Sequence, residues 1–90
     1  MHERSVANQL VRQASEIVVR SGADRAVSVG VRLGGLCGLS EPHLRSQFAA
    51  AADGTPLEDA LLEVLIGDET VNANAQDVVL THVEVADPPA

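Results

Sequence analysis

The spacing of the apolar residues changes near residue 22, and this change restricts the chain to folds that combine helices with a sheet. Between Arg4 and Ser21 apolar residues recur every three or four positions, the period of one helix face. This stripe consists of Val6, Ala7, Leu10, Val11, Ala14, Ile17 and Val18. In residues 25–33, RAVSVGVRL, apolar residues instead take every second position, which predicts a half-buried strand. The positions expected to face the core are Val27, Val29, Val31 and Leu33.

The ends of the first helix carry typical start and stop residues. Ser5, or Glu3 just before it, is expected to be the N-cap. Gly22 suits the left-handed stop, and Arg20 lies favourably in the last turn.

A second helix is predicted after a glycine-rich turn over residues 34–38. Ser40 is a capping residue, Glu41 is an acid for the first turn, and Pro42 sits where no helical hydrogen bond is lost. Leu44, Phe48 and either Ala51 or Ala52 are expected to face the core, and Gly54 ends the helix.

The last third of the chain is less uniform. Residues 56–67 fit a helical and an alternating pattern equally well, residues 68–77 read as a polar loop, and residues 78–85 read as a strand. Residues 86–90 are expected to be a flexible tail. The most economical fold is an α+β two-layer sandwich, in which two helices pack on one face of a three-stranded, mostly antiparallel or mixed sheet.

Composition excludes several classes of partner. Ninety residues with 46% hydrophobic content suffice for one small domain, and Phe48 is the only aromatic residue. The net charge of −7 and the lack of aromatic side chains disfavour binding to nucleic acid or to an anionic membrane. Cys37 is the only cysteine, which suits a reducing cytoplasm, and no apolar run resembles a signal peptide or a membrane span.

Four stretches together resemble the HypA family of nickel metallochaperones, which serve [NiFe]-hydrogenase and sometimes urease maturation. They are the start Met1-His2-Glu3 followed by Ser5, the strand VSVGVRL, the segment GGLCGLSEPHLRSQF over residues 34–48, and the ending Val83-Glu84-Val85. The resemblance implies a cytoplasmic, non-enzymatic accessory protein that delivers Ni(II) to the enzyme precursor. Its implied partners are the GTPase HypB and the hydrogenase large subunit, and the chain is expected to be a monomer or a weak homodimer.

The zinc domain of the family has no counterpart in this sequence. HypA proteins normally carry two Cys-x-x-Cys pairs in a domain inserted between the third and the last strand. Here residues 68–77 occupy that place and contain neither cysteine nor histidine. We therefore expect a single HypA-like domain over residues 1–90 and no bound zinc.

By the same resemblance, Met1, His2 and Glu3 are the nickel ligands. The α-amine, the His2 amide and the His2 imidazole can form fused chelate rings around one ion, with Glu3 as a fourth donor. Nitrogen-rich, near-planar sets of this kind suit Ni(II) or Cu(II) and not tetrahedral zinc. The amine and the imidazole must lose protons to bind, so affinity should fall on mild acidification.

Other interpretations remain open at this point. Taken alone, His2 would be interpreted as a solvated chain end and His43 as a surface residue. His82 would be a satisfied or exposed strand residue, and Cys37 a small packed side chain. The acid pairs Glu58-Asp59 and Asp68-Glu69 read as solvated charge. A metal-free adaptor in hydrogenase assembly is the alternative function, whereas an enzyme is disfavoured because no nucleophile–base or paired-carboxylate constellation is present.

Overall fold

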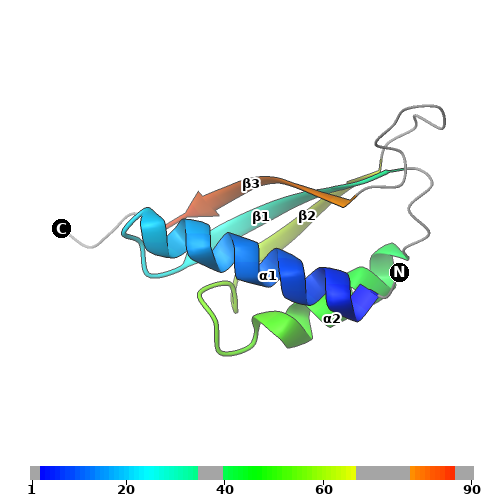
Figure 1. Cartoon of the computed structure of the whole chain (residues 1–90), viewed down its shortest axis with the longest axis horizontal. Coiled ribbons are helices and arrows are strands. Elements are labelled where there is room, and N and C mark those ends of the chain that lie inside the picture. The colour runs from blue at the N-terminus through cyan, green and yellow to red at the C-terminus, as the bar shows by residue number, and fades with distance from the viewer. Residues whose placement is uncertain (1–2, 35–39, 67–77, 87–90) are drawn as a thin grey trace.

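Two helices lie on one side of a three-stranded sheet and leave its other side open (Figure 1). The computed structural model describes residues 3–34, 40–66 and 78–86. The elements are α1 (Glu3–Arg20), β1 (Ala26–Leu33), α2 (Glu41–Ala52), β2 (Leu61–Ile66) and β3 (Val78–Val85). The predicted α+β two-layer fold is therefore confirmed. The turn around Cys37, the loop 68–77 and the end of the tail lie outside the described residues.

The sheet is mixed, with the strand order β2-β1-β3. The central strand β1 pairs in parallel with β2 and antiparallel with β3. Since parallel strands need a crossover connection, α2 serves as the crossover between β1 and β2. The expected antiparallel arrangement thus holds for one of the two strand pairs.

The first helix begins earlier than its expected cap. Ser5 lies inside α1, which starts at Glu3, so Ser5 is not the N-cap and Glu3 is already a helical residue. The error arises because serine is tolerated in the first turn of a helix as well as before it. The predicted stop is correct, because Gly22 has a φ of +80° and the Ser21 hydroxyl donates to the Val18 carbonyl at 2.7 Å.

The expected alternation along β1 fails at its first residues. Ala26 is buried, whereas Val27, expected to face the core, is 42% exposed. The pairing with β3 shifts between Ala26 and Ser28, and this bulge places Val27 on the strand as an extra residue. Beyond the bulge Val29, Val31 and Leu33 are buried as expected, but Ser28 and Gly30 between them are buried as well.

The second helix forms as predicted, and the ambiguous segment contains a turn followed by a strand. Ser40 occupies the N-cap of α2, although its hydroxyl makes no capping hydrogen bond, and Leu44, Phe48 and Ala52 are buried. Gly54 has a φ of +76° and follows the helix as expected. Leu57 is fully buried in the turn before β2, and residues 61–66 form a strand, so the alternating pattern was the correct one.

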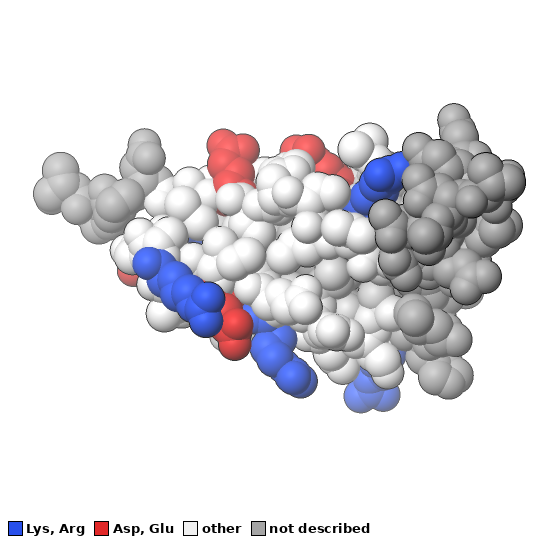
Figure 2. All heavy atoms as spheres, turned by 45° about the horizontal axis from the view of Figure 1, so that its top comes forward, with Lys and Arg blue, Asp and Glu red and all other residues white. Residues whose placement is uncertain are grey.

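The core lies between the helices and one face of the sheet. It is aliphatic apart from Phe48, and α1, β1, α2 and β2 all contribute to it. The largest fully buried side chains are Leu33, Leu44, Leu57, Val18, Val29 and Val31. On the face drawn in Figure 2 the charged side chains are scattered over a mainly uncharged surface. Neither helix in the described part of the chain is long and apolar enough to cross a bilayer.

Candidate metal centre

Of the predicted nickel ligands, only the Glu3 backbone lies within the described residues. Met1 and His2 precede the described residues, and the Glu3 backbone forms the first residue of the helix. The first amide N–H groups of an α-helix have no intrahelical carbonyl partner. The Glu3 amide, which the chelate could use as a donor, is therefore not consumed by helical hydrogen bonding.

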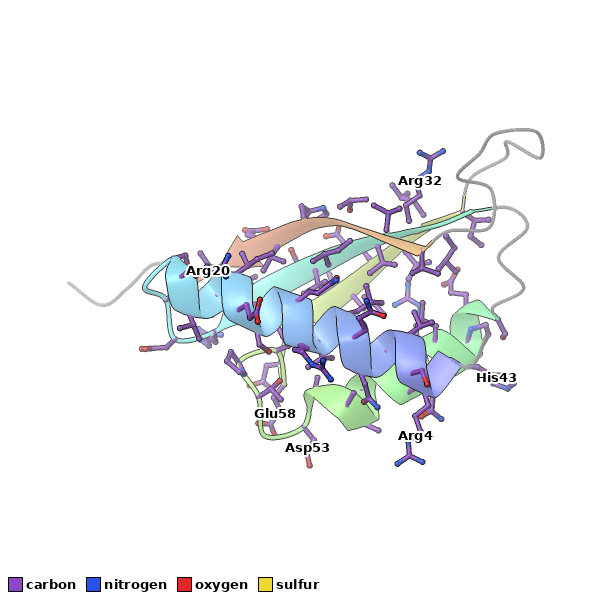
Figure 3. The ribbon with its side chains drawn as sticks, in the orientation of Figure 1. Arg4, Arg20, Arg32, His43, Asp53 and Glu58 are labelled. Atoms are coloured by element: carbon purple, nitrogen blue, oxygen red, sulfur yellow. The ribbon has the colours of Figure 1, made fainter. Side chains whose placement is uncertain are left out.

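The other residues singled out from the sequence are spread over the molecule. His43 is exposed on α2, at the end of the molecule where Arg4 marks the beginning of α1 (Figure 3). Glu58 and Asp59 are exposed in the turn before β2, as expected of solvated charge. Cys37, Asp68 and Glu69 lie outside the described residues. Within residues 3–34, 40–66 and 78–86 no group of three or more His, Cys, Asp or Glu side chains is arranged to hold a metal ion.

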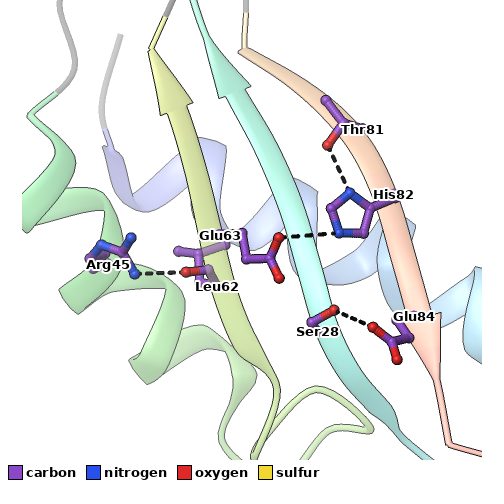
Figure 4. A network of polar contacts seen from close by, with 7 residues as sticks. All are labelled: Ser28, Arg45, Leu62, Glu63, Thr81, His82 and Glu84. Atoms are coloured by element: carbon purple, nitrogen blue, oxygen red, sulfur yellow. Dashed lines mark hydrogen bonds and ion pairs between the residues drawn. The ribbon is translucent and has the colours of Figure 1, made fainter.

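His82 lies on the open face of the sheet and has a partner that the sequence did not predict. Its Nε2 stands 3.6 Å from Glu63 Oε2, and its Nδ1 stands 3.2 Å from Thr81 Oγ1 (Figure 4). The two residues belong to opposite edge strands, and both pair in register with Gly30 of the central strand. The interpretation of His82 as an exposed strand residue is correct, because its side chain is 49% exposed.

Gly30 makes this contact across the sheet possible. A Cβ atom at position 30 would overlap the His82 ring and lie 2.6 Å from Thr81 Oγ1. The ring therefore lies against bare backbone and spans β1 to reach β2. Sequence reasoning missed the pair because it depends on the strand register, and the only signal in the sequence was a glycine in the middle of a strand.

Three further polar contacts involve the sheet and α2. Ser28 Oγ donates to Glu84 Oε1 at 3.2 Å, between β1 and β3. Arg45 of α2 donates from its Nη1 to the Leu62 carbonyl at 2.7 Å and from its Nε to Glu41 at 2.9 Å. In Figure 4 Arg45 reaches β2 from the side that faces away from β1.

Comparison with known proteins decides the family. Residues 1–84 of the 90 match the family described as hydrogenase/urease nickel incorporation, metallochaperone, HypA. The chain belongs to the HypA family. The match includes the Met1-His2-Glu3 start and ends within β3.

Curated relatives carry the same family name. A hydrogenase maturation factor HypA of Chloroflexus aurantiacus is 45% identical over 62 residues, which are 69% of this chain and 54% of the relative. A HypA of Nitrosospira multiformis is 35% identical over 75 residues, or 83% of this chain and 65% of the relative. The chain thus spans about half the length of the first of these relatives, 54% of it.

Solved structures of HypA proteins share the fold. The solution structure of the Ni metallochaperone HypA from Helicobacter pylori superposes with a TM-score of 0.80, covering 94% of this chain and 97% of that one at 16% identity. A second HypA solution structure has a TM-score of 0.75 at 18% identity. At such low identity, these similarities speak for the fold alone.

Proposed function

We propose that this protein is a cytoplasmic nickel metallochaperone that binds one Ni(II) ion through Met1, His2 and Glu3 and delivers it to a [NiFe]-hydrogenase precursor. The observation that supports this best is the match to the HypA family over residues 1–84, which includes the Met1-His2-Glu3 start. The donors would be the α-amine, the His2 amide, the His2 imidazole and a Glu3 group. The protein acts here as a carrier and not as an enzyme, and zinc is not part of the proposal.

The position of α1 supports a site that both holds and releases its cargo. Because the helix begins at Glu3, the ligands are attached to a rigid element without a linker. The N-terminus of a helix carries about half a positive charge, which opposes a bound cation and favours the Glu3 carboxylate. These opposing effects suit a carrier, which must surrender its metal. HypB and the hydrogenase large subunit remain the proposed partners.

A nickel titration of three forms tests the ligand set. The first form is the protein with its native start, in which intact mass verifies Met1. The second form is the His2→Ala variant, and the third carries extra residues before Met1. Both altered forms should lose most of the affinity, because one lacks the imidazole and the other displaces the free amine. His43→Ala serves as the matched control and should bind like the native form.

Two outcomes would contradict the proposal. Equal nickel binding by all three forms would exclude the N-terminal chelate. If no form binds nickel and the protein still captures HypB or a large subunit, the metal-free adaptor becomes the better function.

The same site predicts a strong pH dependence. An α-amine ordinarily has a pKa of about 7.7–8.0 and an imidazole one of about 6.5, and both groups must be deprotonated to bind the metal. Between about pH 8 and about pH 6 these two groups alone should lower the affinity for Ni(II) on the order of a hundredfold, and the proton that a coordinating amide nitrogen must release makes the fall steeper. Isothermal titration calorimetry in several buffers would also report the protons released. A pH-independent affinity would contradict the amine–imidazole chelate.

A further inference from the structure

The pair formed by Glu63 and His82 has the geometry of two metal ligands without the metal. The Nε2–Oε2 distance of 3.6 Å exceeds the range of 2.7–3.2 Å for a direct N–H···O hydrogen bond. Ligand bonds of about 2.0–2.2 Å to one ion at a tetrahedral angle separate the two donor atoms by about 3.4 Å. The observed distance is about 0.2 Å longer than that value.

The contact between His82 Nδ1 and Thr81 Oγ1 affects what can lie between His82 Nε2 and the Glu63 carboxylate. When Nδ1 carries the proton and donates it to Thr81 Oγ1, at 3.2 Å, the Nε2 lone pair faces the Glu63 carboxylate. Two acceptors that face each other need a positive charge between them, either a proton or a metal ion. A hydrogen-bond acceptor on the second ring nitrogen is also the usual way in which proteins orient a ligating histidine.

The pair is open to solvent, between the exposed apolar side chains of Leu61 and Leu65 on β2. The Glu63 and His82 side chains are 51% and 49% exposed, so a hydrated ion can reach them and keep water on its remaining positions. Glu84 lies two residues along β3 and adds negative charge near His82, while it accepts a hydrogen bond from Ser28. Because Gly30 has no Cβ, the ring has room to lie against β1 and to reach toward Glu63.

We propose that Glu63 and His82 form a second divalent-metal site on the open face of the sheet. Its mixed nitrogen and oxygen donors fit borderline cations such as Ni(II) or Zn(II), with water completing the coordination. With only two protein ligands it binds more weakly than the N-terminal chelate. This proposal is independent of the proposed function, because it uses none of Met1, His2 and Glu3. Its ligands lie on the face of the sheet opposite to the helices (Figure 4).

The test uses the His2→Ala protein, so that the N-terminal chelate is absent. Zinc chloride and nickel chloride are each titrated by calorimetry, and the His82 ring resonances are followed by NMR in the zinc titration. One ion should bind per chain, with the largest shifts on His82. Adding His82→Ala or Glu63→Gln should weaken binding at least about tenfold, a loss of about 1.4 kcal/mol.

Matched controls change the same residue types elsewhere. His43→Ala and Glu58→Gln, each in the His2→Ala protein, should leave the binding unchanged. The proposal is overturned if zinc leaves the His82 ring resonances unshifted, since the pair is then only an exposed histidine beside a carboxylate. It is also overturned if His82→Ala binds as tightly as its parent. In the native-start protein, His82→Ala should leave the tighter N-terminal binding intact, so failure of one site is distinguishable from failure of the other.

Discussion

Gly30 shows how a missing side chain shapes the open face of the sheet. Its φ is not in the left-handed region, so the backbone there does not require glycine. What requires it is space, because the His82 ring lies where a Cβ atom would be. One hydrogen atom in place of a methyl group therefore lets side chains from the two edge strands meet across the central one.

Gly30→Ala should be more destabilising while His82 is present than in its absence, when Thr81 Oγ1, 2.6 Å from the added Cβ, is the remaining close neighbour. The new methyl group displaces the His82 ring and breaks its approach to Glu63, whereas alanine by itself tolerates the strand conformation. In a double-mutant cycle with His82→Ala, we expect a coupling free energy of about 0.5–1 kcal/mol. Urea denaturation of the four proteins measures it. If Gly30→Ala lowers the free energy of unfolding equally with and without the His82 side chain, then Thr81 or the backbone limits the space at position 30.

At the level of single elements, β2 is the most exposed apolar segment of the sheet. Leu61, Leu65 and Ile66 are 63%, 66% and 59% exposed, and the strand lies at the edge. Apolar edge strands are prone to pair with other chains. Arg45 counters this tendency, because its guanidinium occupies the Leu62 carbonyl and is held by Glu41.

Replacing Arg45 should therefore affect both stability and association. Arg45→Met keeps most of the apolar stem and removes the hydrogen bond to Leu62 and the exposed ion pair with Glu41. We expect a loss of about 1 kcal/mol in the free energy of unfolding. Self-association, measured by light scattering over a range of protein concentrations, should increase.

Arg12→Met is the matched control for charge and length. Arg12 is exposed on α1, and the described part of the chain offers it no hydrogen bond or ion pair. If both variants associate equally, the lower positive charge and not the freed edge is responsible.

The local pattern was sufficient to predict most elements, and it failed where pairing between strands decides which residues are buried. The periods of α1, β1 and β3 predicted the correct type of element, because each packs one face against the core, which is buried in α1 and β1 and partly buried in β3. The burial of Val27 was predicted wrongly, since a bulge depends on pairing with β3 and leaves no trace in the β1 sequence. Residues 61–66 stayed ambiguous because an edge strand with exposed leucines lacks a clean alternation.

For the molecule as a whole, the fold class follows from the order of the elements, but the strand order does not. The parallel pairing of β1 with β2 depends on α2 crossing over the sheet, which no local period specifies. The Glu63–His82 pair was unpredictable for the same reason, because its members are 19 positions apart and meet only through the register at Gly30. The N-terminal ligands were predicted from family resemblance, and their role remains a prediction.

A single small core makes the whole molecule sensitive to one cavity. Leu44 is fully buried, and its replacement by alanine should cost about 2–5 kcal/mol. Domains of this size are typically stable by only about 5–15 kcal/mol, so Leu44→Ala should lower the midpoint of thermal unfolding sharply. Ala50→Ser, at an exposed position of the same helix, should have a small effect. Similar midpoints for both variants would mean that the core is not the main source of stability.

The pairing of Leu33 with both Ile66 and Val78 bears on how this fold can diversify. Because the end of β2 and the start of β3 flank the same residue, they stand two strand spacings apart, about 10 Å. A handful of residues is enough to bridge such a gap. The sheet therefore sets only a short minimum length for the connection between the two strands, and no maximum length. We therefore expect that a longer insertion, including an independently folding module, can enter between Ile66 and Val78 while the packing of the helices on the sheet is kept. The junction between these two strands is thus the place where this fold can gain or lose a module.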